Sequence, residues 1–467
     1  MADVSAQQFR TQNRVVVIGG GPGGYEGALV AAQLGADVTV VDSDGIGGSA
    51  VVTDCVPSKT LIATAELMTE VEGASELGVL IGDDGVSVDL ARVNERVKRL
   101  ALAQSADITG HLEEDGVRIV HGRGRLADGG VAVDLADGGS TTLGADAIVV
   151  ATGAAPRTLP TAQPDGERIL TWEQVYDLTE VPSRMIVVGS GVTGAEFASA
   201  YNALGIDVVL VSSRDRVLPG EDADAAAVLE DVLVRRGMTV LSKSRMESVV
   251  RDGDTVRVTL TDGRTVEGSH ALLALGSVPR TSGIGLEEAG VELDEGGFVR
   301  VDKVSRTTAR GVYAAGDCTG VLMLASVAGM QGRIAMWHFL GDAVRPLDLR
   351  TVSSNVFTAP EIATVGYSQK DIDEGVIAAE AVMLPLSGNP RAKMQGVHDG
   401  FVKLFARPGT RIVVGGVVVG PRASELIHPV SLAVAASMTA DQVTQAFTVY
   451  PSMSGSTAEA ARQLHRG

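Results

Sequence analysis

The feature that most constrains this chain is an internal repeat. Val15–Asp42 aligns without a gap with Met185–Ser212, and both segments open with apolar β-formers that end in glycines. Each continues with a helix-forming stretch and reaches a second apolar run through an LGxDV junction. Because strand, glycine turn, helix and strand recur in one order, the repeat predicts two βαβ units and an α/β fold. The repeated glycines are Gly19, Gly21, Gly24, Gly189, Gly191 and Gly194.

The glycines of both copies have the spacing G-x-G-x-x-G. The first glycine of such a pattern permits a tight turn, the second lets the backbone approach a pyrophosphate, and the third allows the helix to pack closely on the strand. The N-terminus of the following helix then faces the phosphates. A single copy could be an ordinary structural turn, but two copies in the same strand-turn-helix context favour two dinucleotide sites.

The residue that ends the second strand of each unit indicates which dinucleotide binds there. Asp42 ends the first unit, and a carboxylate accepts hydrogen bonds from ribose hydroxyls but repels a 2′-phosphate, so this site favours FAD or NAD. The second unit has Ser212, Ser213 and Arg214, which supply hydroxyls and a cation. A charge pair at ~5 Å and an effective dielectric near ~20 contributes roughly 3 kcal/mol, so we expect NADPH to be preferred over NADH. The alternative is that Arg214 is a solvated surface charge.

Composition limits the other possibilities. The 467 residues suffice for roughly three domains, and the net charge of −19 argues against nucleic acid or anionic membranes as partners. No apolar run has the ~18 residues of a membrane helix, and the opening MADVSAQQFRTQN lacks the apolar core of a signal peptide, so we expect a cytoplasmic protein. Its 2 cysteines, Cys55 and Cys318, and 7 scattered histidines suit neither a disulfide framework nor a metal site.

The residues after Asp42 carry a more specific signal. They read GIGGSAVVTDCVPSKTLI, which resembles the GGTCxNxGCxPSK pattern of the flavoprotein disulfide reductase family, the group of lipoamide dehydrogenase and glutathione reductase. Further motifs follow in the order of that family: ATG, GSGVTGAE, GSVPRT, GVYAAGDCTG, VFTAPEIATVG and GPRASELI. The resemblance runs from about Arg14 to about Ala461. It implies two Rossmann-like domains, for FAD and NAD(P), and a C-terminal α+β dimerisation domain.

Several residues receive roles from this resemblance. Asp42 would bind the adenosine ribose of FAD, Ser49 its pyrophosphate and Asp317 its ribityl chain. Lys59 and Glu196 would form an ion pair beside the flavin, where the cation stabilises the charge of the reduced cofactor. An exposed pair of little consequence is the alternative. The other implied positions are Gly124, Thr152 and Ala325 for FAD, and Gly276 for NADPH.

The sequence departs from the family at the groups that reduce disulfides. The first of the two redox cysteines is Ala50 here, and Cys55 alone cannot form an internal disulfide. A bridge from Cys55 to Cys318 is the other option, although nothing in the sequence supports its geometry. Where the family reads HxHPTxSE this chain reads TVYPSMSGS, so Tyr450 replaces the acid-base histidine and Gly455 replaces the glutamate that orients it.

These losses all affect the same function, because the groups that reduce a disulfide are absent while both nucleotide sites look intact. They exclude lipoamide and glutathione reduction by the family mechanism and favour hydride transfer from NADPH to FAD and onward to a quinone-type acceptor. This arrangement resembles the lipoamide-dehydrogenase-like NAD(P)H:quinone reductases that lack one redox cysteine. Cys55 would then lie near the flavin without being essential, since a lone buried thiol behaves as a small hydrophobe. The alternatives are a soluble pyridine nucleotide transhydrogenase, whose branch keeps the first cysteine instead, and a non-catalytic flavin-binding subunit.

The order of the motifs predicts four segments. Residues 1–157 form the first part of the FAD-binding domain, 158–280 the NAD(P)H-binding domain, 281–345 the central remainder of the FAD-binding part, and 346–467 the interface domain. Because an interface domain of this family packs against its twin, we expect a homodimer.

Overall fold

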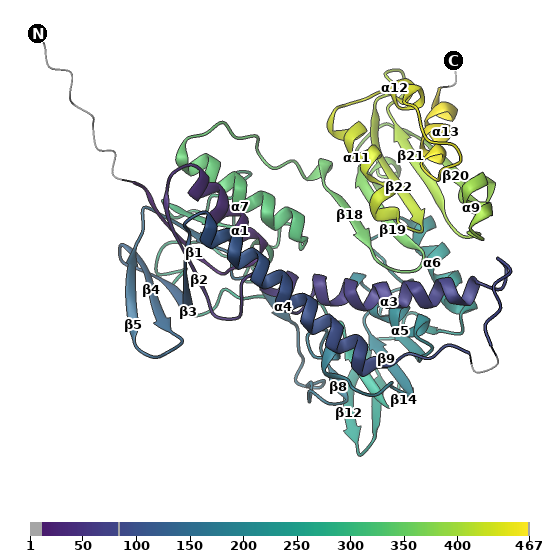
Figure 1. Ribbon diagram of the computed structural model, residues 1–467, viewed down its shortest axis with the longest axis horizontal. Helices are drawn as coiled ribbons and strands as arrows, with labels where there is room; N and C mark the ends of the chain where they lie inside the picture. The colour runs from purple at the N-terminus through teal and green to yellow at the C-terminus, as the bar shows by residue number, and fades with distance from the viewer. Residues whose placement is uncertain (1–11, 83–84, 466–467) are drawn as a thin grey trace, which may run out of the picture. The chain divides into compact units, whose positions relative to one another are not determined.

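The computed structural model describes residues 12–82 and 85–465 (Figure 1). The chain divides into two compact units. Unit 1 takes in the chain up to Val56, Arg99–Ala155 and Ser277–Leu347, and unit 2 takes in Pro57–Lys98, Pro156–Gly276 and the chain from Asp348 onward. The chain crosses between the units within α3 (Cys55–Gly73), α4 (Leu90–Glu114) and β7 (Ala154–Pro156), immediately before β16 (Ser277–Pro279), and between Leu347 and Asp348.

Unit 1 is built on a seven-stranded sheet. Its strands are β1 (Arg14–Ile18), β2 (Asp37–Asp42), β3 (Arg118–Ala127), β4 (Gly130–Leu135), β5 (Ser140–Gly144), β6 (Ala147–Val150) and β17 (Val312–Ala314). The strand order is β17-β6-β1-β2-β3-β4-β5, parallel from β17 to β3 and antiparallel from β3 to β5. β1 and β6 are nearly continuous buried runs of Val, Ile and Ala, as expected of a parallel sheet covered on both faces.

Two helices of unit 1, α1 (Pro22–Gln33) and α7 (Ala325–Leu340), pack closely against each other (Figure 1). Their contact is made of glycines: a side chain on Gly332 would overlap the carbonyl oxygen of Gly23, and one on Gly27 would lie 3.2 Å from the carbonyl oxygen of Gly332. Arg333 of α7 donates from Nε to Glu26 of α1 at 2.8 Å. The close packing holds α1 at the end of β1.

Unit 2 contains a second parallel sheet, of five strands. They are β8 (Ile169–Leu170), β9 (Arg184–Val188), β10 (Asp207–Val211), β11 (Thr239–Leu241) and β15 (His270–Leu273). Their order is β11-β10-β9-β15-β8, and all pairs are parallel. Two helices, α5 (Val192–Ala203) and α6 (Ala223–Arg235), connect strands of this sheet, and a three-stranded antiparallel sheet follows. Its strands are β12 (Met246–Asp252), β13 (Thr255–Leu260) and β14 (Thr265–Gly268).

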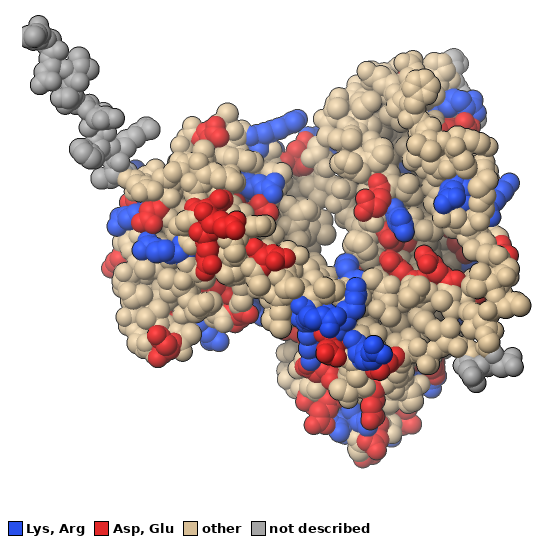
Figure 2. Space-filling view, viewed as in Figure 1, with Lys and Arg blue, Asp and Glu red and all other residues tan. Residues whose placement is uncertain are grey.

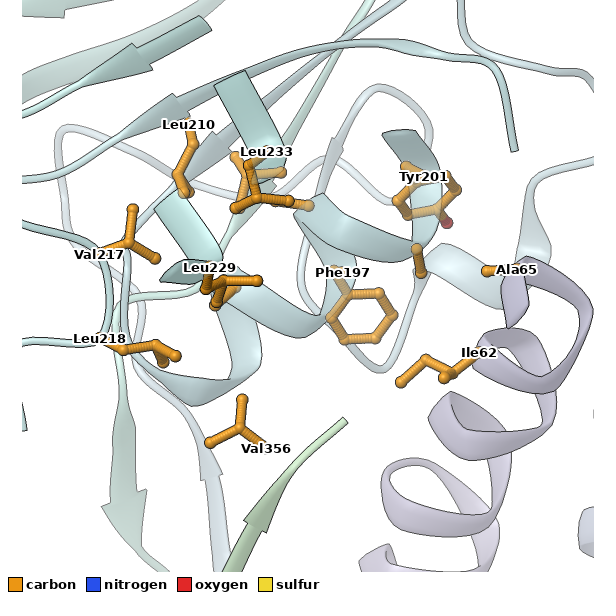
Figure 3. Packing of buried hydrophobic residues seen from close by; sticks show 14 of the residues in the cluster. Ile62, Ala65, Phe197, Tyr201, Leu210, Val217, Leu218, Leu229, Leu233 and Val356 are labelled. Carbon is orange, nitrogen blue, oxygen red and sulfur yellow. The ribbon is translucent and has the colours of Figure 1, made fainter. Parts of the chain in front are cut away.

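A hydrophobic core in unit 2 fixes how α3 and α5 meet. Phe197 and Tyr201 of α5 face Ile62 and Ala65 of α3 in this core (Figure 3). The rings of Phe197 and Tyr201 are stacked at 6.3 Å between centroids. Burial of an Ile or Phe side chain contributes roughly 1.5–3 kcal/mol, so this contact stabilises the packing of the two helices.

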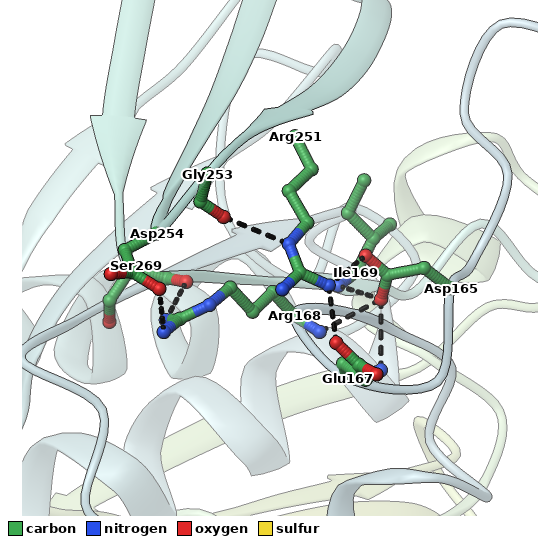
Figure 4. A network of polar contacts seen from close by, with 8 residues as sticks. All are labelled: Asp165, Glu167, Arg168, Ile169, Arg251, Gly253, Asp254 and Ser269. Atoms are coloured by element: carbon green, nitrogen blue, oxygen red, sulfur yellow. Dashed lines mark hydrogen bonds and ion pairs between the residues drawn. The ribbon is translucent and has the colours of Figure 1, made fainter.

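A charged network anchors the turn before β8 (Figure 4). The Asp165 carboxylate accepts backbone N–H bonds from Glu167, Arg168 and Ile169 at 2.8–2.9 Å, and one from Nη1 of Arg251 at 3.2 Å. Burial opposes the charge of this carboxylate, but the donors outweigh burial and lower the pKa of Asp165. Because Arg251 belongs to β12, the network ties the antiparallel sheet to the edge of the parallel one.

The C-terminal part of unit 2 is an antiparallel sheet with helices. Its strands are β18 (Ser353–Val356), β19 (Glu361–Gly366), β20 (Glu380–Pro385), β21 (Phe401–Ala406) and β22 (Val413–Gly420), in the order β18-β19-β22-β21-β20. Its helices are α8 (Gln369–Asp373), α9 (Pro390–Met394), α10 (Ala423–Leu426), α11 (His428–Ala435), α12 (Ala440–Gln445) and α13 (Gly455–Leu464). Lys403 of β21, almost fully buried, donates to Asp222 at 2.9 Å and Asp224 at 2.6 Å at the start of α6.

The predicted fold class is confirmed: two Rossmann-like parallel-sheet parts and a C-terminal α+β part are present. The two repeats form the βαβ units β1-α1-β2 and β9-α5-β10. The division into segments 1–157, 158–280, 281–345 and 346–467 stays a prediction. The expectation about a signal peptide concerns mainly residues 1–11, which lie outside the described residues. No helix within 12–82 and 85–465 is long and apolar enough to cross a membrane. Acidic and basic side chains are interspersed on the visible face of each unit (Figure 2).

Candidate functional site

The first glycine loop connects β1 to α1. Gly19 has a φ of +103°, and a side chain there would overlap the carbonyl oxygen of Ala151. A side chain on Gly24 would overlap the carbonyl oxygen of Gly19. Gly21 is different, because the nearest atom to a Cβ there would be 3.9 Å away, on Gly48. The first and third glycines therefore allow close packing, and the second leaves an open approach to the backbone, as a pyrophosphate requires.

The second glycine loop, between β9 and α5, repeats this geometry. Gly189 has a φ of +114°, and its side chain would overlap the carbonyl oxygen of Ala274, while one on Gly194 would overlap that of Gly189. Nothing lies within 4 Å of a Cβ on Gly191. Both loops thus have the same two packed glycines and the same open one.

Asp42, at the end of β2, organises the first loop. Its Oδ2 accepts the N–H of Gly20 at 2.7 Å, and its Oδ1 accepts those of Asp44 at 2.9 Å and Gly45 at 2.6 Å. An ionised carboxylate has about four acceptor positions, so capacity is left for ribose hydroxyls. The sequence indicated only the ligand role, whereas the structure adds that Asp42 holds the glycine loop.

A second glycine pair lies against the first loop. Gly47 donates its N–H to the carbonyl of Gly20 at 2.8 Å, and a Cβ on Gly48 would come within 2.7 Å of the Cα of Gly21. Ser49 follows at the start of α2 (Gly48–Val52) and is partly exposed. The predicted pyrophosphate residue therefore stands beside the open side of the loop.

Asp317 begins the short helix η2 (Asp317–Thr319), close in sequence to α7. Gln331 of α7 steadies this segment, accepting from the N–H of Gly316 at 2.8 Å and donating to the Thr319 hydroxyl at 3.3 Å. Burial raises the pKa of the Asp317 carboxyl, and no hydrogen bond or ion pair of its side chain is found within the described parts of the chain. A half-buried carboxylate of this kind suits the hydroxyls of a ribityl chain.

The three remaining predicted FAD positions differ in their exposure to solvent. Gly124 is buried in β3, where a Cβ would lie 3.1 Å from Ile18, so its lack of a side chain serves strand packing. The Thr152 hydroxyl is buried beside the thiol of Cys318. Ala325 is exposed as the first residue of α7. The open loop and the Asp317 carboxylate fit an FAD molecule, whereas the direct contacts of Gly124, Thr152 and Ala325 stay predictions.

The segment after β10 differs from the expectation at one residue. Ser212 is 0% exposed, and its hydroxyl lies 2.6 Å from that of Ser190 in the glycine loop and accepts the N–H of Arg214 at 3.1 Å. Because both contacts are internal, Ser212 holds the loop instead of presenting a hydroxyl at the surface. Ser213 and Arg214 are exposed, as binding would require. Gly276 has a φ of +85°, and no atom lies within 4 Å of a Cβ placed there.

The structure brings Lys59 of α3 and Glu196 of α5 together. Lys59 Nζ lies 2.8 Å from Glu196 Oε2, and the side chains are 30% and 5% exposed. The N–H of Phe357, just after β18, donates to Glu196 Oε1 at 2.9 Å, and Lys59 Nζ lies 5.0 Å from the centroid of the Phe357 ring. The burial of Glu196 argues against an inconsequential surface pair.

Cys55 and Cys318 are not joined in a disulfide. Cys318 is fully buried, which raises its pKa to about 11, whereas Cys55 is partly exposed at the start of α3. Tyr450 is 83% exposed, and Gly455 is the first residue of α13. No cluster of metal-ligating residues is found in the described residues.

Comparison with known families decides the assignment. Residues 13–332 match the model of pyridine nucleotide-disulphide oxidoreductases, and residues 352–461 match the dimerisation domain of the same family. The chain belongs to this family. The expectation of an FAD- and NAD(P)H-dependent oxidoreductase is thereby confirmed at the level of the family, and the C-terminal sheet with its helices is the dimerisation domain.

Individual relatives of this oxidoreductase are similar over nearly its whole length. A protein of Mycobacterium tuberculosis named NAD(P)H dehydrogenase (quinone) is 56% identical over 461 residues, 97% of this chain and 94% of that protein. A dihydrolipoyl dehydrogenase of Chlorobaculum tepidum is 34% identical over 465 residues, 98% of each chain. The crystal structure of LpdA from Mycobacterium tuberculosis superposes with a TM-score of 0.93 at 55% identity, covering 97% of this chain and 100% of that one.

Three residues of the candidate site were not predicted from the sequence. Phe357 binds Glu196 through its main chain, Ser190 binds Ser212, and Gln331 supports the segment of Asp317. Ser190 and Phe357 lie inside recognised motifs, but the motifs do not say which side chains or N–H groups they meet. Gln331 carries no signal beyond its place in a helix.

Proposed function

We propose that this protein is an FAD-dependent NAD(P)H:quinone oxidoreductase. The observation that carries the proposal is Ala50: one redox sulfur is missing while both glycine loops keep their open geometry. Two electrons can therefore enter from a nicotinamide, but no internal disulfide can take them onward. The Mycobacterium tuberculosis relative at 56% identity carries a name that agrees with this proposal.

The first site would hold FAD. Gly21 and Ser49 would border its pyrophosphate, Asp42 would accept hydrogen bonds from ribose hydroxyls, and the Asp317 carboxylate would accept them from the ribityl chain. FAD would carry two electrons from NADPH to the acceptor, so that NADPH, a proton and a quinone give NADP⁺ and a hydroquinone.

The second site would hold the nicotinamide coenzyme. Gly191 leaves room for its pyrophosphate, and the exposed Arg214 would favour a 2′-phosphate, so that NADPH is preferred over NADH. The hydrogen bond between Ser190 and Ser212 joins the glycine loop to the segment that carries Arg214.

Lys59 would supply a positive charge toward the flavin when it is reduced, with Glu196 and Phe357 holding the ammonium in place. Cys55 is not required by this scheme, because neither hydride entry nor electron exit needs a thiol.

Two other functions would use the same fold. A soluble transhydrogenase would pass the hydride to a second nicotinamide, but it keeps the first cysteine, which is Ala50 here. A non-catalytic flavin-binding subunit has no use for the second glycine loop or for the Lys59–Glu196 pair. The quinone reductase is therefore favoured. We also propose that the enzyme is a homodimer, on the strength of the dimerisation domain, and that it is cytoplasmic.

Stopped-flow mixing of the purified holoenzyme with NADPH tests the proposal at its first step. We expect bleaching of the flavin absorbance within seconds and recovery when a quinone is added. No bleaching by NADPH or NADH would favour the non-catalytic subunit. Bleaching followed by recovery with thio-NAD⁺ but not with quinones would favour the transhydrogenase.

A further inference from the structure

Two exposed cations lie beyond neighbouring strands of the unit 2 parallel sheet. Val211 and Leu241, the last residues of β10 and β11, are partners in the parallel ladder. Arg214 follows the first strand and Lys243 the second, and the N–H of Lys243 donates to the carbonyl of Arg214 at 2.6 Å. Both side chains are exposed. The two cations therefore belong to adjoining backbone segments at the carboxyl edge of the sheet, where ligands of such sheets bind.

The backbone at Lys243 is unusual. Its φ of +53° places it in the left-handed region, which a lysine rarely adopts. The next residue keeps it there, because the N–H of Ser244 donates to the carbonyl of Ser212 at 2.7 Å and its hydroxyl accepts from Arg264 at 2.7 Å. Ser212 therefore helps to fix the backbone next to Lys243 and also accepts the N–H of Arg214.

Other charged groups of this segment have different environments. Arg216 donates to the carbonyls of Pro219 and Glu221 at 3.3 and 3.4 Å, so its guanidinium supports the loop. Neither Arg214 nor Lys243 has an ion-pair partner among residues 12–82 and 85–465. Asp215, also exposed, carries a negative charge between Arg214 and Arg216.

We infer that Lys243 is a specificity-determining residue that, together with Arg214, binds the 2′-phosphate of NADPH. The inference rests on the proposed use of NADPH at this site. A phosphate monoester carries about −1.5 to −2 charges near neutral pH, more than one guanidinium neutralises. The Lys243 ammonium would supply the second cation, and the main-chain hydrogen bond from Lys243 to Arg214 holds the two backbone segments together.

The test compares Lys243→Gln, Arg214→Gln and the double variant with wild type. The control is Lys370→Gln, which also removes one positive charge, from a side chain in another part of the chain that is 77% exposed. The readouts are kcat/KM for NADPH and NADH, and the dissociation constants of 2′,5′-ADP and 5′-AMP by calorimetry at fixed ionic strength. We expect Lys243→Gln to weaken NADPH use and 2′,5′-ADP binding roughly five- to tenfold. NADH and 5′-AMP should change less than twofold, and Lys370→Gln should change nothing.

Each other outcome contradicts a defined step. If Arg214→Gln weakens NADPH use but Lys243→Gln behaves like the control, the inference is wrong and the proposed coenzyme preference stands. If wild type prefers NADH and Arg214→Gln has no effect, the coenzyme preference itself is wrong. Equal losses for NADPH and NADH in Lys243→Gln would show a general effect on the loop and overturn the inference. If Lys243→Gln fails to fold, Lys243→Asn, which tolerates the left-handed region, takes its place.

Discussion

Replacing Lys59 by methionine removes the partner of a buried carboxylate. Glu196 is 5% exposed and would keep one donor, the Phe357 N–H at 2.9 Å, while losing the ammonium at 2.8 Å. Breaking a fully buried pair costs about 3–5 kcal/mol. Because Lys59 is 30% exposed, water screens part of its charge, and we expect Lys59→Met to lower the free energy of unfolding by about 2 kcal/mol. The ring contact to Phe357 is included in that figure.

A double-mutant cycle isolates this energy. Urea unfolding of the holoenzyme, followed by circular dichroism, is measured for Lys59→Met, Glu196→Gln and the double variant. Glu196→Gln keeps an acceptor for the Phe357 N–H but removes the buried charge, so the double variant should be more stable than Lys59→Met. The matched control is the exposed pair Lys370–Glu374, 3.7 Å apart, whose coupling energy should stay below about 0.5 kcal/mol.

The same variant tests the proposed chemistry. Lys59→Met should slow flavin reduction by NADPH one to three orders of magnitude, or about 1.4 to 4 kcal/mol of activation free energy. A coupling energy for Lys59 and Glu196 as small as that of the control, together with an unchanged rate of flavin reduction, would refute the reasoning.

Three further predictions concern other residues. Arg214→Asp should lower kcat/KM for NADPH on the order of a hundredfold relative to NADH, measured at fixed ionic strength. An unchanged ratio of the two kcat/KM values would show that Arg214 does not bind the coenzyme. Cys55→Ser should keep most of the NADPH:quinone activity in a steady-state assay, and a variant that is dead toward quinones yet still reducible would show that electrons leave through sulfur. His270 is half-buried, and burial, with a contribution from Arg168, lowers its pKa to about 4. The unfolded state takes up this proton near pH ~6.5 and the folded state only near pH 4. The free energy of unfolding should therefore decrease as the pH is lowered from ~6.5 to 4, by on the order of 1 kcal/mol after solvent screening. His270→Gln should remove that part of the pH dependence in urea unfolding at pH 7 and pH 4.5, and an unchanged difference would contradict it.

The βαβ units were predictable because their signal is local. A glycine with positive φ between a buried strand and a helix appears directly in the spacing of Gly19 and Gly24, and again in that of Gly189 and Gly194. The fold class follows from the recurrence of this local pattern. The pairing of Lys59 with Glu196 is distant in sequence, and it came from the family resemblance and not from spacing.

What escaped prediction depends on contacts between distant segments. No pattern in the chain indicates that the N–H of Phe357 meets Glu196, because any residue can donate that bond. The burial of Ser212 likewise depends on Ser190, whose position in G-x-G accepts many residues. Sequence reasoning therefore assigned Ser212 a ligand-facing hydroxyl, whereas its environment makes it a loop residue.

Steady-state turnover with NADPH and a panel of acceptors tests the central claim most directly. The panel contains a soluble naphthoquinone, ferricyanide, thio-NAD⁺ and lipoamide, assayed with wild type and with Ala50→Cys. The account predicts turnover with the quinone and none with lipoamide in either protein, because Tyr450 and Gly455 cannot supply the acid-base pair even when the second sulfur is restored. Lipoamide turnover by wild type at a rate comparable to that of the quinone would contradict it.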